Sequence, residues 1–546
     1  MSRDRSLATE TASRDAIIAV LLVVLALGLR WLLYGWFAGR EPDFARLLAA
    51  SDHSPLYREA LLAHLGEYLL YNHTEPPLAI LRDWAVEAFV GPANTNLASM
   101  VVAGISDSLA AGLAFLIARR IGAGLALSIL AGLLTSHRFL LLEVTTLGGG
   151  WDSINPFLAT LYLWLLIDLV QIPGRGRAIL AGFAALLLIA SHTFGAPVVV
   201  ATLVVAGAML SARTGQGRLA ALAFVFPALL IGWTVAKNGV QHGVWSMSSG
   251  VGQNVLQAYA RSFKDPSGQE RGVWLMTKRE GYPDWWIWCY DEARNRNMHS
   301  NLNIPSWYGT CMYRRTGNAV VPDYAGLEAY FAENPNPGME ALVAKDMAIA
   351  AERPWLWSGP VSWRATGVSI AYGAVSKNVL ADLLLSRPDK FIGRMISTLR
   401  QHWFYNGAVS YTLLNRPPYE EPGIVYAINL AIIPLFYLGN FIAIAALFRT
   451  LWRLYGKWRG RVKEVCRDAR EDARAVLAFA ITPVMALSVL LACCENYRHA
   501  LVFLPVLLAL SLDALGRREF WAALQGFPGQ ALSAVRRLHP GRTPTS

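Results

Sequence analysis

The sequence predicts an all-α polytopic membrane protein of about ten transmembrane helices, with a large mixed extracytoplasmic domain. Hydrophobic residues make up 54% of the 546 residues, charged residues make up 16%, and the mean hydropathy is +0.34. Because soluble domains carry about 25% charged residues, this chain has too few charges to cover a soluble surface. High hydrophobicity and low charge also exclude an intrinsically disordered chain.

The second observation is a series of apolar runs near the length of about 20 residues that a helix needs to cross a bilayer. The first run, 16–38, follows three arginines and lacks a small-residue cleavage site, so we expect an uncleaved first span. Nine further runs predict the remaining spans: 98–118, 122–140, 152–171, 178–193, 195–212, 218–236, 424–448, 475–493 and 497–515.

The third observation is the distribution of positive charge, which concentrates in cytoplasmic loops of membrane proteins. If the ten spans alternate, every basic cluster falls on one side, and both termini are cytoplasmic. The clusters are Arg119 with Arg120, Arg175 with Arg177, Arg213 with Arg218, the 449–474 loop, and Arg517 with Arg518. The net charge of +11 is thereby explained. No basic stripe with interleaved aromatic residues is present, so no nucleic-acid partner is expected.

The spans divide the chain into four parts. Residues 1–237 form a seven-helix module with a first outer loop at 39–97, and residues 238–423 form an extracytoplasmic domain. Residues 424–518 form a three-helix module, and 519–546 a cytoplasmic tail. Cys289 and Cys311 lie in the outer domain, where the compartment favours oxidation, and whether they form a disulfide stays open.

Acidic residues of the first outer loop are the candidate catalytic groups. Glu41 and Asp43 follow the first span directly, where a carboxylate can act as a general base on an incoming hydroxyl or amine. Asp52 is a competing candidate. Further along, Pro76 and Pro77 stop any preceding helix and predict a rigid corner before an amphipathic helix.

Several polar residues at the same outer boundary are candidate substrate-binding groups. Arg138, Glu143 and Asp152 flank the next outer turn, where arginine suits a phosphate and the alternative is mutual charge neutralisation. His192 lies between two spans and either donates to a phosphate or ends a helix. Arg498 and His499 form a dense charged turn between the last two spans, which favours ligand binding.

Asp107 lies within a predicted span, where an ionisable group is expensive and therefore a functional candidate. Its alternative role is a hydrogen bond between helices. No site is predicted to bind a metal and no cofactor is certain, although a divalent ion stays open. No nucleotide-binding loop or zinc-protease motif is present.

Together these features resemble the GT-C superfamily of integral-membrane glycosyltransferases, which use polyprenyl-phosphate-linked sugars. Seven spans precede an outer domain, and Pro76-Pro77-Leu78 resembles the Pro-Pro-Leu of the protein mannosyltransferase and aminoarabinose transferase branches. The acidic first outer loop is the superfamily's hallmark, so the resemblance implies Asp43 as catalytic carboxylate, with Glu41 as the fallback. It also implies that Arg138 and Glu143 match the family's Arg-then-acid segment, and that the turn with Arg498 matches its terminal basic motif.

The resemblance implies transfer of a sugar from a polyprenyl-phosphate donor to an extracytoplasmic lipid, glycan or protein acceptor. The partners are then this donor, membrane lipid and an unknown acceptor, and the location is a cell membrane, the inner one where a periplasm exists. Two alternatives stay open: a lipid or solute transporter, and a non-catalytic assembly subunit with a GT-C-like fold. The sugar, the acceptor, the isoprenoid length and the oligomeric state are not encoded in any motif.

Overall fold

The computed structural model describes most of both predicted membrane modules and short parts of the region between them. The described residues are 2–40, 55–73, 76–145, 151–192, 195–248, 313–316, 319–322, 337–357, 423–460, 468–491, 502–518 and 520–522, with a few positions between 385 and 396. These residues are almost entirely helical, and a helix lies at every one of the predicted spans. The predicted all-α polytopic membrane class is therefore confirmed.

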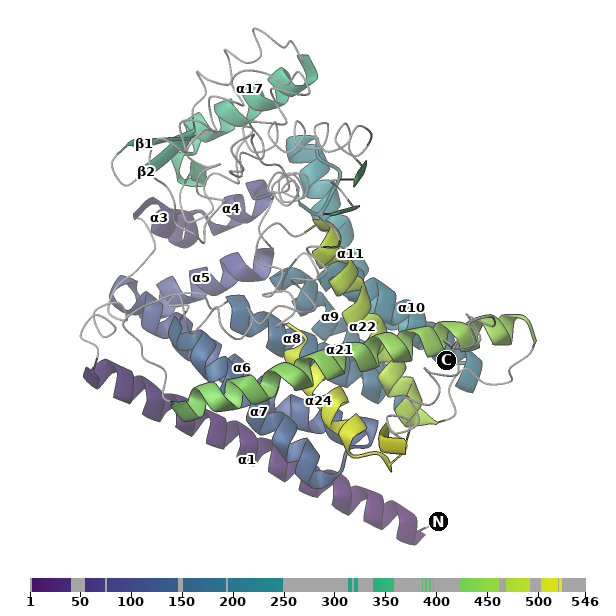
Figure 1. The fold of residues 1–546 in the computed structure, drawn as a ribbon. Helices are drawn as coiled ribbons and strands as arrows, with labels where there is room; N and C mark the ends of the chain where they lie inside the picture. Colours follow the sequence, from purple (N-terminus) through teal and green to yellow (C-terminus); the bar gives the residue numbers. More distant parts are fainter. Residues whose placement is uncertain are drawn as a thin grey trace, which may run out of the picture.

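The helices follow the predicted order (Figure 1). The N-terminal module consists of α1 (Ser2–Arg40), α3 (Pro55–Ala63), α4 (Leu65–Tyr71), α5 (Pro77–Val90), α6 (Thr95–Ile121), α7 (Leu125–Thr145), α8 (Trp151–Gln171), α9 (Arg175–Ser191), α10 (Gly195–Thr214) and α11 (Arg218–His242), with a 3-10 turn η1 (Pro92–Asn94). The C-terminal module consists of α21 (Gly423–Trp458), α22 (Ala469–Leu491) and α24 (Leu504–Leu515).

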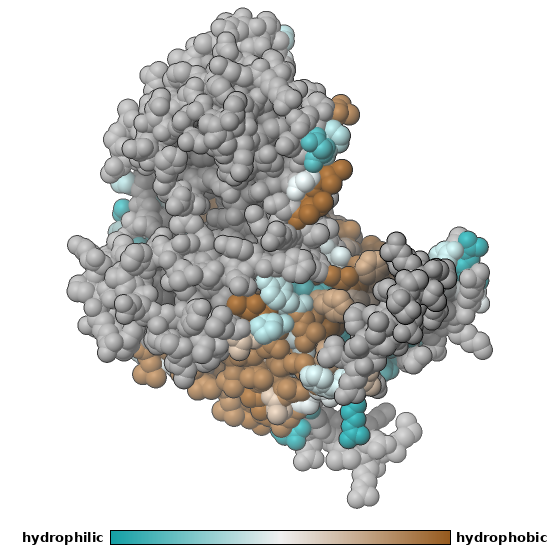
Figure 2. Space-filling model, in the orientation of Figure 1, coloured by the Kyte–Doolittle hydropathy of each residue, from teal (hydrophilic) through white to brown (hydrophobic). Residues whose placement is uncertain are grey.

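By length and composition, six helices of the described ranges can cross a membrane. They are the apolar parts of α1, α6, α8, α10, α11 and α21. Large apolar side chains on these helices face outward, such as Val204 at 66% exposure and Phe441 at 69%. In Figure 2 the coloured area in the lower middle of the view is mainly hydrophobic, with a few hydrophilic residues among it. This outward apolar surface suits contact with lipid, while the number of ten spans stays a prediction.

Some helix ends differ from the predicted ones. α11 continues to His242 instead of ending near 236, and it stops where Gly243 adopts a left-handed conformation with φ 69°. Gly243 and Val244 donate their backbone N–H groups to the carbonyls of Gly239 and Asn238, which satisfies the last turn. α21 continues to Trp458, so the predicted 449–474 loop begins as helix.

Small residues let the helices approach closely, as is common in membrane bundles. A side chain at Gly182 of α9 would place its Cβ 2.5 Å from the carbonyl oxygen of Ala223 in α11. Gly439 of α21 lies in the same way against the carbonyl of Leu507 in α24, where a Cβ would collide with the carbonyl oxygen. One continuous apolar core therefore joins the N-terminal module to the C-terminal one.

The ends of the helices that carry the predicted cytoplasmic arginines form one charged layer, which we call the inner end. Asp168 of α8 pairs with Arg120 and Arg177, at 2.7 and 2.5 Å. Asp513 of α24 is buried and pairs with Arg474, at 3.0 Å, and with Arg517. Further pairs in this layer are Arg119–Asp15, Arg213–Asp472, Arg449–Glu471 and Arg453–Glu471. The arginines that the sequence assigns to one side thus lie at one end of the bundle.

Between the two modules, the structure describes a short hairpin and a helical segment. Strands β1 (Tyr313–Thr316) and β2 (Ala319–Pro322) pair antiparallel, with Arg314 opposite Val321. Helix α17 (Pro337–Glu352) is followed by the 3-10 turn η2 (Pro354–Trp357). The turn η2 packs on α3 of the first outer loop. This placement brings part of the predicted outer domain onto the end of the bundle opposite the charged layer, which we call the outer end.

Candidate functional site

The described part of the first outer loop folds onto the outer end of the bundle. Its helices α3, α4 and α5 contact one another, and α5 also contacts α6 and α9 while α4 contacts α11. A small core of Tyr57, Tyr68 and Ile80 holds the three helices together with Leu356 of η2. The loop is therefore a packed cap on the bundle, built from elements of two predicted domains.

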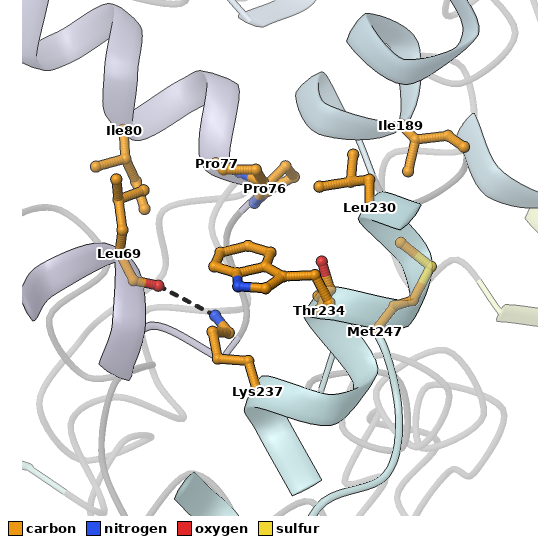
Figure 3. Close-up of a pocket in the computed structure, with 10 residues that line it drawn as sticks. Leu69, Pro76, Pro77, Ile80, Ile189, Leu230, Thr234, Lys237 and Met247 are labelled. Atoms are coloured by element: carbon orange, nitrogen blue, oxygen red, sulfur yellow. Dashed lines mark hydrogen bonds between the residues drawn. The ribbon is translucent and has the colours of Figure 1, made fainter. Parts of the chain in front are cut away.

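The predicted corner at Pro76 and Pro77 is confirmed as the start of α5. Pro76 is the N-cap residue with extended backbone angles, and Pro77 occupies the first helical position. Proline suits that position because its missing N–H would have no partner in the helix and its φ is already helical. The rings of both prolines face a pocket between the loop and the bundle (Figure 3).

This pocket is lined mostly by apolar side chains and by one basic side chain, that of Lys237. Its wall includes Ile189 of α9 and one face of α11 with Leu230, Trp233, Thr234 and Lys237. The empty space is about 400 Å³, part of which is open to solvent. Ile189 lies one turn before His192, so the pocket adjoins a predicted binding residue.

Two side chains at the end of α11 bind the carbonyl end of α4. Lys237 Nζ donates to the carbonyl of Leu69, at 3.2 Å, and to the carbonyl of Asn72. His242 Nε2 donates to the carbonyl of Tyr71, at 2.7 Å. A cation near the last carbonyls of a helix is favourable because those groups lack partners within the helix.

His73 lies beside this contact and is almost fully buried, at 1% exposure. Its ring packs against the ring of His242 with centroids 4.7 Å apart. Burial lowers the pKa of His73 well below its ordinary value, and the neighbouring His242 and Lys237 lower it further. His73 is therefore neutral at physiological pH.

Within the loop, a second polar contact holds α3 on α5. Tyr57 donates its hydroxyl hydrogen to Asp83 at 2.8 Å, and Arg82 pairs with the same carboxylate. Burial, and next the charge of Asp83, raise the pKa of Tyr57, so the phenol stays protonated and keeps donating. This contact fixes the fold of the loop rather than forming a reactive centre.

At membrane depth, polar side chains of three helices are buried. Arg30 of α1 is 1% exposed and donates to the hydroxyl of Ser136 in α7, at 3.2 Å. Asp107 of α6 is fully buried, as its position within a predicted span implied. Because charges in this environment are expensive, Arg30 and Asp107 are functional candidates in their own right.

Four of the predicted site residues lie in, or directly after, helices that the structure describes. Arg138 and Glu143 lie on the outer half of α7, and Asp152 lies in the first turn of α8. For these three residues the structure describes the helical backbone and not the side chain. His192 is partly buried and ends α9, with its N–H bonded to the carbonyl of Leu188. These positions share the outer end with the first outer loop.

Other predicted residues lie outside the described residues. They are the candidate bases Glu41, Asp43 and Asp52, the terminal pair Arg498 and His499, and the cysteines Cys289 and Cys311. Among the residues that the structure does describe, no group of three or more His, Cys, Asp or Glu side chains could hold a metal ion.

Sequence reasoning missed Arg30, Lys237 and His242. Arg30 lies inside the first apolar run, where an isolated arginine was itself a signal of a buried polar contact. Lys237 and His242 fall just past the predicted end of their span, where charged residues normally face water. Their partners are backbone carbonyls at 69–72, which no sequence pattern identifies.

Comparison with known proteins gives a likeness in solved structures only. No family model matches the sequence, and no curated protein matches it. AglB, an archaeal oligosaccharyltransferase from Archaeoglobus fulgidus in complex with an inhibitory peptide and a dolichol-phosphate, superposes with a TM-score of 0.36 and 12% identity. The alignment covers 97% of this chain and 52% of AglB, so the chain spans about half the length of that protein.

ArnT from Cupriavidus metallidurans superposes in two states. The form bound to undecaprenyl phosphate gives a TM-score of 0.30 at 13% identity, over 89% of this chain and 77% of ArnT. The apo form gives 0.29 at 14% identity. The superpositions are loose, so the proposal below rests on this chain's own residues.

Proposed function

We propose that this protein is a membrane glycosyltransferase that moves a sugar from a polyprenyl-phosphate donor to an extracytoplasmic lipid, glycan or protein acceptor. The observation that carries the proposal is the packing of the first outer loop. Its described part folds onto the same end of the bundle where α7, α8 and α9 bring Arg138, Asp152 and His192. A first outer loop that carries Glu41 and Asp43 in its sequence, together with Arg138 and His192 on helices that reach the same end, supports a reaction on a phosphate-linked lipid.

In the proposed reaction the acceptor hydroxyl or amine attacks the anomeric carbon of the sugar. Asp43, or Glu41 in its place, takes the proton of the attacking group, the new glycosidic bond forms with inversion, and the bond between the sugar and the phosphate breaks. The polyprenyl phosphate leaves with the electron pair. Arg138, Arg498 and His192 stabilise its charge, because fixed cations act most strongly where charge develops.

Two further assignments belong to the same proposal. Glu143, Asp152 and His499 contribute to substrate binding at this end. The outer end faces the extracytoplasmic side, which puts both termini and the charged inner layer in the cytoplasm and the large domain in the periplasm or its equivalent. The positive-inside distribution of the arginines supports this orientation.

The test compares polyprenyl-phosphate lipids by mass spectrometry from the native host with wild-type protein, with Asp43→Asn and with the gene deleted. We expect a sugar-linked polyprenyl phosphate to accumulate in the deletion strain, and to accumulate equally in the Asp43→Asn strain at matched expression. General-base loss lowers such rates about 10²- to 10⁴-fold. An unchanged lipid pool in the deletion strain would contradict the transferase proposal, and accumulation in the deletion alone would contradict the role of Asp43.

A further inference from the structure

The outer end contains a contact whose role the proposed reaction leaves unexplained. Two side chains of α11 donate to three carbonyls at the end of α4, those of Leu69 and Tyr71 in its last turn and that of its C-cap residue Asn72. Lys237 could extend into water, since it lies at the outer end of its helix. Instead its ammonium lies under the loop, bonded to the carbonyl of Leu69 (Figure 3) and 5.3 Å from the ring centroid of Trp233.

The position of Lys237 places it behind the corner of the first outer loop. Lys237 lines the same pocket as Pro76 and Pro77, which follow the carbonyls that it binds by only a few residues. Those prolines fix the backbone, so an anchor at Asn72 also sets the direction in which α5 leaves the corner. Upstream, α4 follows α3 directly and packs against it. The anchor therefore acts on the whole described part of the loop.

The segment 337–357 holds the same helix from the opposite side. Arg353 donates to Glu67 at 2.9 Å and lies 5.5 Å over the ring of Tyr71. Trp355 stacks on His64 with ring centroids 3.6 Å apart. Helix α4 is thus held between a membrane helix and a segment of the predicted outer domain.

We propose that Lys237 is a positioning residue for the transfer reaction, fixing the described part of the first outer loop against the membrane bundle. This inference rests on the proposed function. Lys237 touches no reacting atom: it bonds the carbonyls of Leu69 and Asn72, and it acts through the loop that bears Asp43. His242 supplies a second, weaker anchor at Tyr71, because it makes one hydrogen bond there whereas Lys237 makes two.

The expected kinetic signature follows from this geometry. The donor phosphate is assigned to basic groups on other elements, so loss of Lys237 leaves the KM for the donor within about twofold. A displacement of about 1 Å at a catalytic group lowers rates by as much as about 10²-fold, so kcat falls about 10- to 100-fold. A residue with only a structural role would lower the amount of folded protein and leave kcat per folded molecule unchanged.

The experiment uses the full chain in lipid nanodiscs and two readouts. Lys237→Met removes the donor at similar size, Lys237→Arg retains a cation that can donate, and His242→Ala removes the second anchor. Lys345→Met is the matched control, because Lys345 also donates to two carbonyls, Val240 and Gln241 at the end of α11, without touching α4. The readouts are amide hydrogen exchange of peptides covering 65–73, and kcat and KM with the donor that the lipid comparison identifies.

We expect Lys237→Met to raise the exchange rate of 65–73 and to lower kcat. Lys237→Arg should keep both quantities within about threefold of their wild-type values, because arginine can still donate to the carbonyls. Lys345→Met should change neither quantity. Unchanged exchange in Lys237→Met would overturn the anchor. Faster exchange with wild-type kcat would overturn the positioning role while leaving the transferase proposal intact. If the wild type itself transfers no sugar, the proposed function fails and the catalytic role of Lys237 fails with it, while exchange still reports on the anchor. If Lys237→Met does not fold, His242→Ala gives the same two readouts with a smaller expected change.

Discussion

At the inner end of the bundle, ion pairs join membrane helices to one another, whereas at the outer end side chains of the membrane helix α11 hold the first outer loop by its backbone carbonyls. The inner pairs join helices directly, as Asp168 does with Arg120 and Arg177. The outer contacts join a membrane helix to a loop, as Lys237 does with Leu69. An ion pair between rigid helices fixes the scaffold, while a donor on a carbonyl fixes a short helix that would otherwise move. We infer that the inner end maintains the fold and that the outer end orients the site.

The largest effect on stability is expected at the inner end. Asp513→Ala removes a carboxylate that pairs with both Arg474 and Arg517 and whose side chain is only 1% exposed. Because both arginines keep some contact with water, we expect a loss of about 2–3 kcal/mol, at the low end for a broken buried pair. Thermal unfolding in detergent measures it.

Glu471→Ala is the matched control, since Glu471 also pairs with two arginines, at 2.7 and 2.8 Å, but is 16% exposed. Surface pairs of this kind contribute up to about 1 kcal/mol. Equal losses for the two variants would contradict the difference in burial on which the inner-end comparison rests.

A smaller loss is expected between the two ends. Gly182→Ala forces α9 and α11 apart, because the new Cβ would lie 2.5 Å from the carbonyl oxygen of Ala223. Overpacking of this kind costs about 1–3 kcal/mol. Gly176→Ala in the same helix meets nothing within 4 Å and should not destabilise. If both variants unfold at the wild-type temperature, the helices are not packed as closely as described.

The two ends should respond differently to acid. The pKa of His73 is lowered by burial, so below about pH 6.5 the unfolded loop binds a proton that the folded loop does not, and the outer end loses stability as pH falls. The N–H groups of Glu471 and Arg470 lower the pKa of Asp468 at the inner end, so that contribution is lost only below about pH 3.8.

Amide hydrogen exchange, corrected for the intrinsic rate at each pH, should therefore be faster at pH 5.5 than at pH 7.5 in 65–73 and unchanged around 468–474. His73→Asn should remove the acceleration, because asparagine does not titrate. Acceleration of both regions, or persistence in the variant, would show that His73 is not the titrating group.

The smallest effect is expected for Lys345→Met, at about 0.5 kcal/mol or less, because Lys345 is exposed and its contact is shared with water. Thermal unfolding beside wild type checks it. A loss comparable to that of Asp513→Ala would mean that α17 supports α11 more strongly than its contacts indicate.

The sequence predicted the bundle better than the contacts within it. Apolar runs located the helices because a helix that crosses a bilayer must be long and hydrophobic. The arginine clusters located one end of the bundle because positive charge concentrates in the loops on one side of a membrane. Their partners could not be predicted, since Asp513 and Ile121, both bonded by Arg474, lie far apart in the chain. At the site, the Pro76–Pro77 corner followed from local backbone chemistry. The role of Lys237 could not be predicted in this way, because its partners are backbone carbonyls, which every residue has.

During synthesis, α24 leaves the ribosome after α22, and it carries a carboxylate into an apolar environment. Arg474 is already present on α22 when Asp513 arrives, and it also bonds the carbonyl of Ile121 at the end of α6. The last helix thus inserts next to a waiting partner, instead of presenting a bare charge to the translocon. A nascent chain interrupted before α24 would lack the carboxylate that pairs with Arg474, and the described contacts would leave that arginine with the carbonyl of Ile121.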